Sequence, residues 1–253
     1  MEFYPTDTKG PEIHGSVLIL PIVSTGNVAQ LAVDLLISTF EFKRIGILDS
    51  RYLVPAVGGR EDGEEGITTP IELYQKKGSK VLAIQQRSPA MKSHKAEFIS
   101  SLLSFIESSQ ISLVIILSGM DLSNRPDAHM QATTYHFIPE RAGIPLPSIL
   151  EELKTHVPSL APSTITAGEI PGLPGSGLTR QILSSLPAFF PPTGLILEYA
   201  LEGDNRDDAR ILAGAVARCL QKELGITGQE GWREPSSWKE GLFGTTHDQT
   251  LFG

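Results

Sequence analysis

S-V-L-I-L-P-I-V, residues 16–23, is the stretch from which the fold of this chain is inferred. Its apolar run is nearly continuous, which is typical of a strand that is covered on both faces of a sheet. The residues that follow, 27–39, place apolar side chains at helical spacing, so we predict a helix there. Residues 44–49 (R-I-G-I-L-D) then return as a strand. The chain is therefore predicted to begin with a βαβ unit.

The same alternation continues along the chain. Apolar runs and helical spacings predict strands at 71–74, 81–86, 113–117, 133–138 and 195–201, and helices at 95–108, 148–155, 178–186 and 204–224. Strands that alternate with helices predict an α/β fold, here a three-layer α/β/α domain with a mostly parallel central sheet. We expect this domain to extend over residues 1–227, followed by an extended C-terminal tail over 228–253.

Composition excludes several classes of protein. The chain has 253 residues, 40% of them hydrophobic, which permits a sizeable core. The net charge is −8 and no long run of Lys or Arg occurs, which argues against a nucleic-acid binder. No apolar run approaches the ~20 residues that span a bilayer, and M-E-F-Y-P-T-D-T lacks the pattern of a signal peptide. The single cysteine, Cys219, lies on an apolar helical stripe, and we expect it in the core of an intracellular protein.

Two clusters could bind an anion or a metal. The loop P-G-L-P-G-S-G-L-T, residues 171–179, precedes a helix, but it lacks the Lys-Ser/Thr pair of a phosphate-binding loop, so we interpret it as a tight turn. The acidic residues Glu202, Asp204, Asp207 and Asp208 could supply oxygen ligands. Their spacing suits helix initiation better, with Asp204 as the cap. We therefore expect no metal and no cofactor.

Catalytic residues are harder to assign. Asp49 and Ser118 lie near the ends of predicted strands, where α/β enzymes place catalytic groups. A triad with one of the scattered histidines could be drawn, but no G-x-S-x-G motif accompanies Ser118. An enzyme of nucleoside phosphorylase or hydrolase type remains the alternative, and no catalytic residue is assigned.

The end of the chain is unusual. Large apolar residues gather where periodicity is weakest, namely Trp232, Pro235, Trp238, Leu242 and Phe243. Because tryptophan buries a large area, we predict that this segment straps onto the domain or onto a partner. After a polar spacer the chain finishes on Leu251, Phe252 and Gly253. Such an apolar tip either folds back on its own domain or is held out for a partner.

Four blocks of the sequence resemble the proteasome assembly chaperone 2 family. They are G-N-V-A-Q-L-A-V-D-L-L-I-S-T (26–39), L-V-P-A-V-G (53–58), E-G-D-N (202–205) and W-R-E-P-S-S-W-K-E-G-L-F-G (232–244). The blocks come in the family's order and extend over nearly the whole chain, whereas residues 121–162 match little.

The resemblance implies a role in binding and not in catalysis. It implies a heterodimer with proteasome assembly chaperone 1 that sits on the α-ring of the 20S core particle, promotes its correct assembly, and is cytoplasmic and nuclear. Members of this group use a C-terminal hydrophobic–Tyr–X tail that enters pockets between α subunits. The matching positions are Leu251, Phe252 and Gly253. Phe252 replaces the tyrosine, so a hydroxyl hydrogen bond would be lost.

Overall fold

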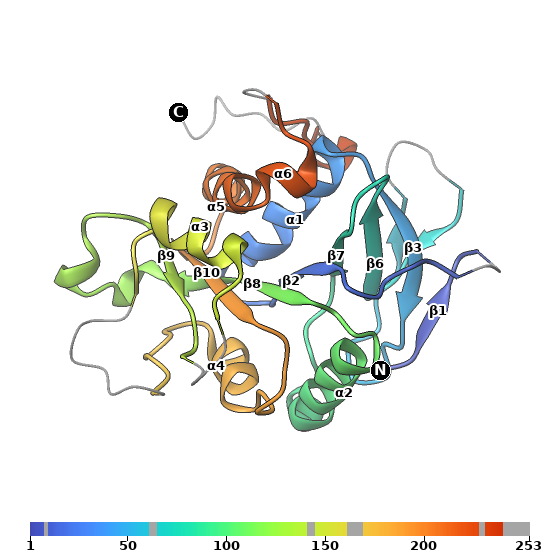
Figure 1. Ribbon diagram of the computed structural model, residues 1–253, viewed down its shortest axis with the longest axis horizontal. Coiled ribbons are helices and arrows are strands. Elements are labelled where there is room, and N and C mark those ends of the chain that lie inside the picture. Colours follow the sequence, from blue (N-terminus) through green and yellow to red (C-terminus); the bar gives the residue numbers. More distant parts are fainter. Residues whose placement is uncertain (8–9, 61–64, 141–144, 161–168, 228–230, 240–253) are drawn as a thin grey trace.

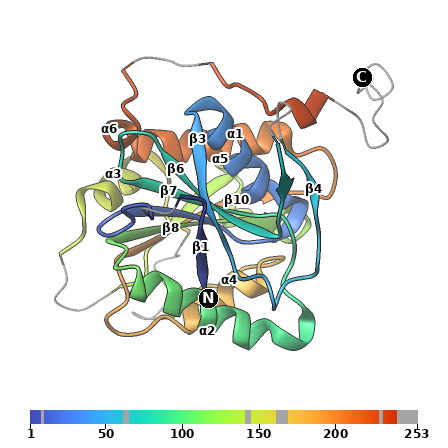
Figure 2. The ribbon, with the colours of Figure 1, turned by 90° about the vertical axis from the view of Figure 1, so that its right-hand side faces the viewer.

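The computed structural model describes residues 1–7, 10–60, 65–140, 145–160, 169–227 and 231–239. Within them a mixed sheet lies between two layers of helices (Figure 1). The helices are α1 (Val28–Thr39), α2 (Lys95–Ser108), α3 (Ser148–His156), α4 (Gly177–Ser184), α5 (Arg206–Cys219) and α6 (Gln221–Leu224). Helices α2 and α4 cover one face of the sheet, and α1, α3, α5 and α6 cover the other (Figure 2). The three-layer α/β/α architecture is thus confirmed.

The eight-stranded sheet has the order β1-β3-β6-β7-β2-β8-β10-β9. Its strands are β1 (Phe3–Pro5), β2 (Val17–Pro21), β3 (Phe42–Leu48), β6 (Ile71–Lys76), β7 (Val81–Gln86), β8 (Leu113–Asp121), β9 (Thr134–Phe137) and β10 (Thr193–Ala200). The four central strands, β7, β2, β8 and β10, are parallel, and the pairs at both ends are antiparallel. A separate ribbon pairs β4 (Gly58–Gly59) with β5 (Ile67–Thr68). The parallel character expected from the apolar runs is therefore a property of the centre of the sheet.

Strand β2 shows why its apolar run is continuous. Leu18 and Leu20 belong to the core under α2 and α4, whereas Val17 and Ile19 belong to the core under α1 and α5. Side chains alternate between the faces of a strand, so a strand buried on both faces needs apolar residues at every position. The prediction of a central strand from this apolar run is confirmed, because both faces of β2 are buried.

The predicted βαβ unit exists in a modified form. Strand β3 runs in the same direction as β2, but the antiparallel hairpin β6–β7 is inserted between the two strands. The hairpin turn contains Gly78 at φ +72°, a conformation that favours glycine. Insertion of the hairpin depends on strand pairing and could not be read from local periodicity.

The last long helix is divided. We expected one helix over 204–224, but α5 ends at Cys219 and α6 begins at Gln221. Leu220 between them leaves helical geometry, at φ −104° and ψ 23°, while its side chain stays buried. Gly225, at φ +67°, ends α6 as a left-handed cap, as expected.

Candidate functional site

Hydrogen bonds join the turn that follows β2 to the turn that follows β10. The Asn205 side-chain amide donates to the carbonyl oxygens of Gly26, at 3.1 Å, and of Leu201, at 2.8 Å. In return the Gly26 N–H donates to Glu202 Oε1 at 3.3 Å. Asn205 is only 4% exposed. Two of the sequence blocks, one at the start of α1 and one at the start of α5, therefore meet at the carboxyl ends of parallel strands.

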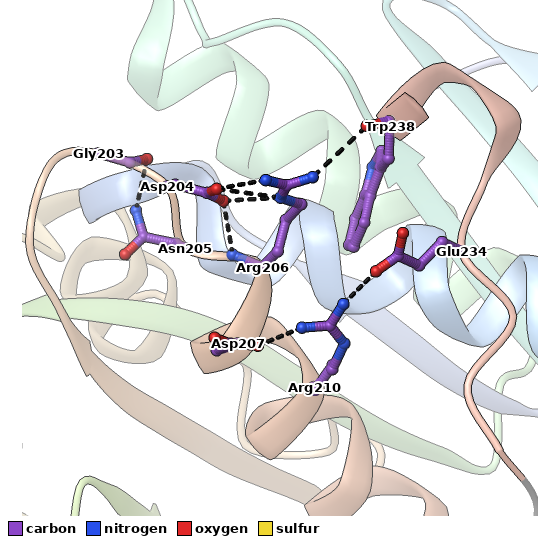
Figure 3. Close-up of polar contacts among 8 residues, drawn as sticks. All are labelled: Gly203, Asp204, Asn205, Arg206, Asp207, Arg210, Glu234 and Trp238. Atoms are coloured by element: carbon purple, nitrogen blue, oxygen red, sulfur yellow. Dashed lines mark hydrogen bonds and ion pairs between the residues drawn. The ribbon is translucent and has the colours of Figure 1, made fainter. Parts of the chain in front are cut away.

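Two acidic residues near the start of α5, Asp204 and Asp207, pair with arginines of that helix (Figure 3). Asp204 accepts hydrogen bonds from the Arg206 side chain, at 2.8 Å from Nε, and from the Arg206 backbone N–H at 3.3 Å. Asp207 accepts from the guanidinium of Arg210. Asp204 was expected to cap the helix, but Asn205 occupies the N-cap position and its side chain makes no capping hydrogen bond. Asp204 lies one residue earlier, where its Oδ1 accepts from the Arg206 backbone N–H. In the part of the chain that the structure describes, no three His, Cys, Asp or Glu side chains are placed to hold a metal ion.

The same two arginines fasten the C-terminal segment, residues 231–239. Arg210 donates to the carboxylate of Glu234, and Arg206 Nη1 lies 3.5 Å from the Trp238 carbonyl oxygen (Figure 3). Arg206 and Arg210 thus each join the start of α5 to this segment. The segment runs across the outer side of the helical layer formed by α1 and α5 (Figure 2).

Apolar contacts accompany the polar ones. The Trp232 ring meets the Phe40 ring at the end of α1 edge-on, with centroids 6.3 Å apart and planes at 80°. The backbone N–H of Arg233 donates to Thr39 Oγ1 at 3.1 Å. Pro235 is buried, and Trp238 packs against the same core as Trp232. The segment therefore bridges α1 and α5 through side chains and backbone.

We predict that the Trp232–Phe40 contact holds the segment more strongly than the ion pairs do. Trp232→Ala should lower the free energy of unfolding by about 2–3 kcal/mol, less than a fully buried tryptophan because the ring is half-buried. Glu234→Gln should cost about 0–1 kcal/mol, since its partner Arg210 lies at the surface. Urea unfolding of both variants tests this, and equal losses would contradict it.

A groove of about 630 Å³ opens beside the segment, between α1 and the β3 side of the sheet. Its basic lining residues are Lys43, Arg44, Arg60, Arg87 and Arg233, and its acidic ones are Asp34, Glu41 and Glu65. Arg87 is paired with Asp34 at 2.9 Å, and Arg44 with the buried Glu72 at 2.8 Å. Arg233 is paired with Glu41 at 3.6 Å. Three of the five basic residues of the groove are therefore ion-paired with carboxylates.

A buried carboxyl group lies in strand β10. Glu198 is 0% exposed, accepts a hydrogen bond from the Thr134 hydroxyl on β9, and is near Asp208 of α5. Burial raises the pKa of Glu198 from 4.5 to about 7, against the opposing effect of the threonine hydrogen bonds. Its second oxygen, Oε1, has no hydrogen-bond partner among the described residues. A lone Glu inside the apolar run L-I-L-E-Y-A-L was the sequence signal that we overlooked.

The structure contradicts an Asp49–His–Ser118 triad. Asp49 follows β3 and is paired with Arg51, whereas Ser118 lies in β8 and shares a hydrogen bond of 2.8 Å with Thr179. Strands β6, β7 and β2 separate β3 from β8. At a spacing of about 4.8 Å between strands, the two positions are roughly 19 Å apart, which is too far for a single histidine to bridge.

Two other candidates from the sequence, the loop 171–179 and Cys219, have structural roles. The loop 171–179 packs against the end of β8, where the Ser176 hydroxyl donates to the Gly119 carbonyl and Asp121 N–H donates to Pro174 O at 2.9 Å. It leads directly into α4, as the tight-turn interpretation expects. Cys219 is buried in the core, and burial raises the pKa of its thiol to about 11.

The predicted docking residues Leu251, Phe252 and Gly253 lie outside the described residues, as do Leu242 and Phe243 of the predicted strap. They remain predictions. In the parts of the chain that are described, no helix is both long and apolar enough to cross a membrane. The sequence also did not reveal the roles of Asn205, Arg206 and Arg210, although E-G-D-N was recognised as a block.

Fold and site together define a three-layer α/β domain whose C-terminal segment is fastened across its helices. The chain belongs to the PAC2 family, whose family model matches residues 18–209. The resemblance noted in the sequence is thereby confirmed. The matched range ends within α5, so the fastened segment follows it.

Individual relatives agree. The chain is 29% identical to Proteasome assembly chaperone 2 of Bos taurus over 270 aligned positions, which cover 99% of this chain and 100% of the relative. It is 31% identical to Proteasome assembly chaperone 2 of Nematostella vectensis over 212 positions, covering 78% of this chain and 86% of the relative. Among solved structures, Pyrococcus furiosus PbaA, described as an archaeal homolog of proteasome-assembly chaperone, has a TM-score of 0.61 at 18% identity and covers 89% of this chain and 84% of its own. This last likeness concerns the fold.

Proposed function

We propose that this chain is a proteasome assembly chaperone that acts by binding. The observation that carries the proposal is its 29% identity to Proteasome assembly chaperone 2 of Bos taurus along 99% of its own length and the whole of that relative. The archaeal chaperone homolog PbaA supports it by having the same fold. We further propose, from the family resemblance, a heterodimer with proteasome assembly chaperone 1 on the α-ring of the 20S core particle, in the cytoplasm and nucleus.

In this proposal Leu251, Phe252 and Gly253 form the docking tail. Burial of the leucine and phenylalanine would contribute roughly 1.5–3 kcal/mol each, and the terminal carboxylate adds a charge-assisted contact to a basic pocket residue. Ordering the preceding backbone opposes this, at about 1–2 kcal/mol per fixed residue. One tail therefore binds weakly, and it gains strength when the body of a heterodimer is already docked.

The fastened segment gives the tail a defined origin. Arg206, Arg210 and the Trp232–Phe40 contact hold residues 231–239 on the domain. The remaining fourteen residues, 240–253, could extend at most roughly 46–50 Å from that point. A limited reach raises the effective concentration of the tip at a pocket within range.

The test is capture of α subunits by the chain together with proteasome assembly chaperone 1. Removal of residues 251–253 should weaken capture about tenfold, because the net gain from the tip is on the order of 1.4 kcal/mol after ordering. Phe252→Tyr is the matched control. It keeps the ring and restores the hydroxyl, so capture should be retained or strengthened.

Two results would contradict parts of this proposal. Undiminished capture after truncation would show that the body surface suffices and that the tail is not a docking element. Absence of capture by the intact chain and its partner would reject the α-ring as the target.

A further inference from the structure

A second groove, of about 800 Å³, lies between α2 and α4, on the face of the sheet opposite α1 and α5 (Figure 1). Two of its lining residues, Ile99 and Leu103 of α2, are buried and form an apolar floor. The serines that line it, Ser100 and Ser104 of α2 and Ser185 after α4, are exposed. An apolar floor with a polar rim suits an apolar side chain that enters from another molecule.

An exposed aromatic side chain lies beside this α2–α4 groove. Phe189 is 96% exposed, the highest value among the large apolar residues of the described chain. Its turn is fixed, because the Phe190 N–H donates to the Pro187 carbonyl oxygen at 3.1 Å and Phe190 is buried in the core. Pro187 lines the groove, so the Phe189 Cα lies within about 7 Å of a groove residue. An aromatic ring on a fixed turn is a suitable anchor for an interface.

The α2–α4 groove carries opposite charges at its two ends. Lys95, Ile99, Leu103 and Glu107 line it at a spacing of four residues, so they form one stripe along α2. Lys95 and Glu107 are about 18 Å apart along the helix axis, and Lys92 lies at the lysine end. In the described part of the chain, these three charged side chains have neither an ion pair nor a hydrogen bond. Their charges are therefore available to another molecule.

This stripe is complementary to a second copy of itself. When two copies face each other with their α2 helices antiparallel, the lysine end of each lies against the Glu107 end of the other. The apolar centres, Ile99 and Leu103, then meet in the middle. A two-fold arrangement of this kind makes every contact twice. The antiparallel helices also place the positive end of one dipole near the negative end of the other.

We propose that the α2–α4 face is a surface through which two copies of this chain associate, with Phe189 of each copy bound in the groove of the other. Lys92 and Lys95 of one copy pair with Glu107 of its partner. The association goes beyond the proposed function. It leaves residues 231–239 uncovered, because Trp232 and Trp238 pack on the opposite layer of helices (Figure 2).

The size of the face predicts a weak association. Helix α2 has 14 residues and is about 21 Å long. Two helices side by side, each about 10 Å wide, give a face of roughly 400 Å². This is about half of the ~800 Å² that each partner contributes to a standard interface. We therefore expect a Kd on the order of 10–100 µM, so that the chain is almost entirely monomeric at about 1 µM.

The first experiment is sedimentation velocity of the full chain between about 1 and 300 µM. We expect the weight-average sedimentation coefficient to rise from that of a monomer toward that of a dimer. Phe189→Ala should weaken association about a hundredfold, because each of the two rings in the dimer contributes about tenfold. Its urea unfolding at about 1 µM should be unchanged, since the side chain is exposed. Met130→Ala, at a residue that is 65% exposed between β8 and β9, is the control and should associate as the unmodified chain does.

A charge swap tests the antiparallel arrangement. One chain carries Lys92→Glu and Lys95→Glu, and a second chain carries Glu107→Lys. Each alone should associate at least tenfold more weakly than the unmodified chain, because like charges then face each other. In an equimolar mixture both contacts again join opposite charges, so the dimer should return. Loss of association through a damaged fold would not be repaired by mixing.

Three results would overturn the proposal. The first is a sedimentation coefficient that stays constant up to about 300 µM, which would leave this face to a different protein. The second is equal association of the Phe189→Ala and Met130→Ala variants. The third is a mixture of the two charge-reversed chains that remains monomeric. The samples contain neither α subunits nor proteasome assembly chaperone 1, so failure here would leave the capture result of the proposed function untouched.

Discussion

Gly26→Ala is expected to destabilise the protein by about 3 kcal/mol or more and to lower Tm by roughly 6–12 °C. Gly26 has φ +63°, where a non-glycine residue costs roughly 1–2 kcal/mol. A Cβ atom there would lie 2.4 Å from Asn205 Nδ2 and 2.8 Å from the Leu201 carbonyl oxygen. To relieve this clash Asn205 must move, and the buried hydrogen bonds that join α1 to α5 would then be lost, at about 1–3 kcal/mol for each unsatisfied group.

The matched control is Gly78→Ala. Gly78 has φ +72° in the turn between β6 and β7, but no atom lies within 4 Å of its Cβ position. It therefore reports the backbone cost alone, about 1 kcal/mol. Comparing the free energies of unfolding of both variants in urea separates the cost of the positive φ from the cost of the steric clash at Gly26. If the two variants lost equal stability, the lock between Gly26 and Asn205 could relax without cost, and our account of this turn would be wrong.

Glu198→Gln is expected to remove much of the pH dependence of stability between pH 5 and pH 8. The pKa of Glu198 is raised from 4.5 to about 7 in the folded state. Between these values the folded state holds a proton that the unfolded state releases, so stability falls as pH rises. The loss amounts to about 2–3 kcal/mol and is nearly complete above pH 7.

The glutamine variant isolates this effect. It carries no proton to lose, so it should match the unmodified chain near pH 5 and exceed it by about 2–3 kcal/mol at pH 8. The comparison at each pH cancels the other titrating groups, including His136, whose pKa is lowered by burial. Glu107→Gln, on the exposed side of α2, serves as the control for replacing a glutamate by a glutamine. Parallel profiles for the unmodified chain and Glu198→Gln would show that this carboxyl ionises without penalty.

Helix α2 shows what periodicity can predict. Phe98, Leu102 and Ile106 recur at helical spacing, and the expected range 95–108 is the observed range of α2. The buried strands β2, β8 and β10 were likewise located from their apolar runs, because burial on both faces leaves a local signature. In such elements the pattern of apolar residues shows which faces are buried.

The candidate site was harder to predict from the sequence than the fold was. Trp232 and Trp238 identified the C-terminal segment as one that needs a surface to cover, but not which surface. Its position on α1 and α5 follows from Phe40, Thr39 and the arginines of α5, none of which is distinctive in sequence. The groove depends on residues from α1, β3, β6 and the C-terminal segment, and no local pattern brings these together.

The sequence by itself therefore determined the central strands, the helices that cover them and the membership suggested by the four blocks. The tertiary structure decided the insertion of β6–β7 between β2 and β3, the hydrogen bonds between Gly26 and Asn205, the burial of Glu198 and the set of residues that line the groove. The physical reason is distance along the chain. Gly26 and Asn205 are separated by 179 positions, and the pKa of Glu198 depends on burial by strands and helices from elsewhere in the chain. The spacing of apolar residues shows which positions along the chain are buried. Only the folded structure determines which residues pack against them.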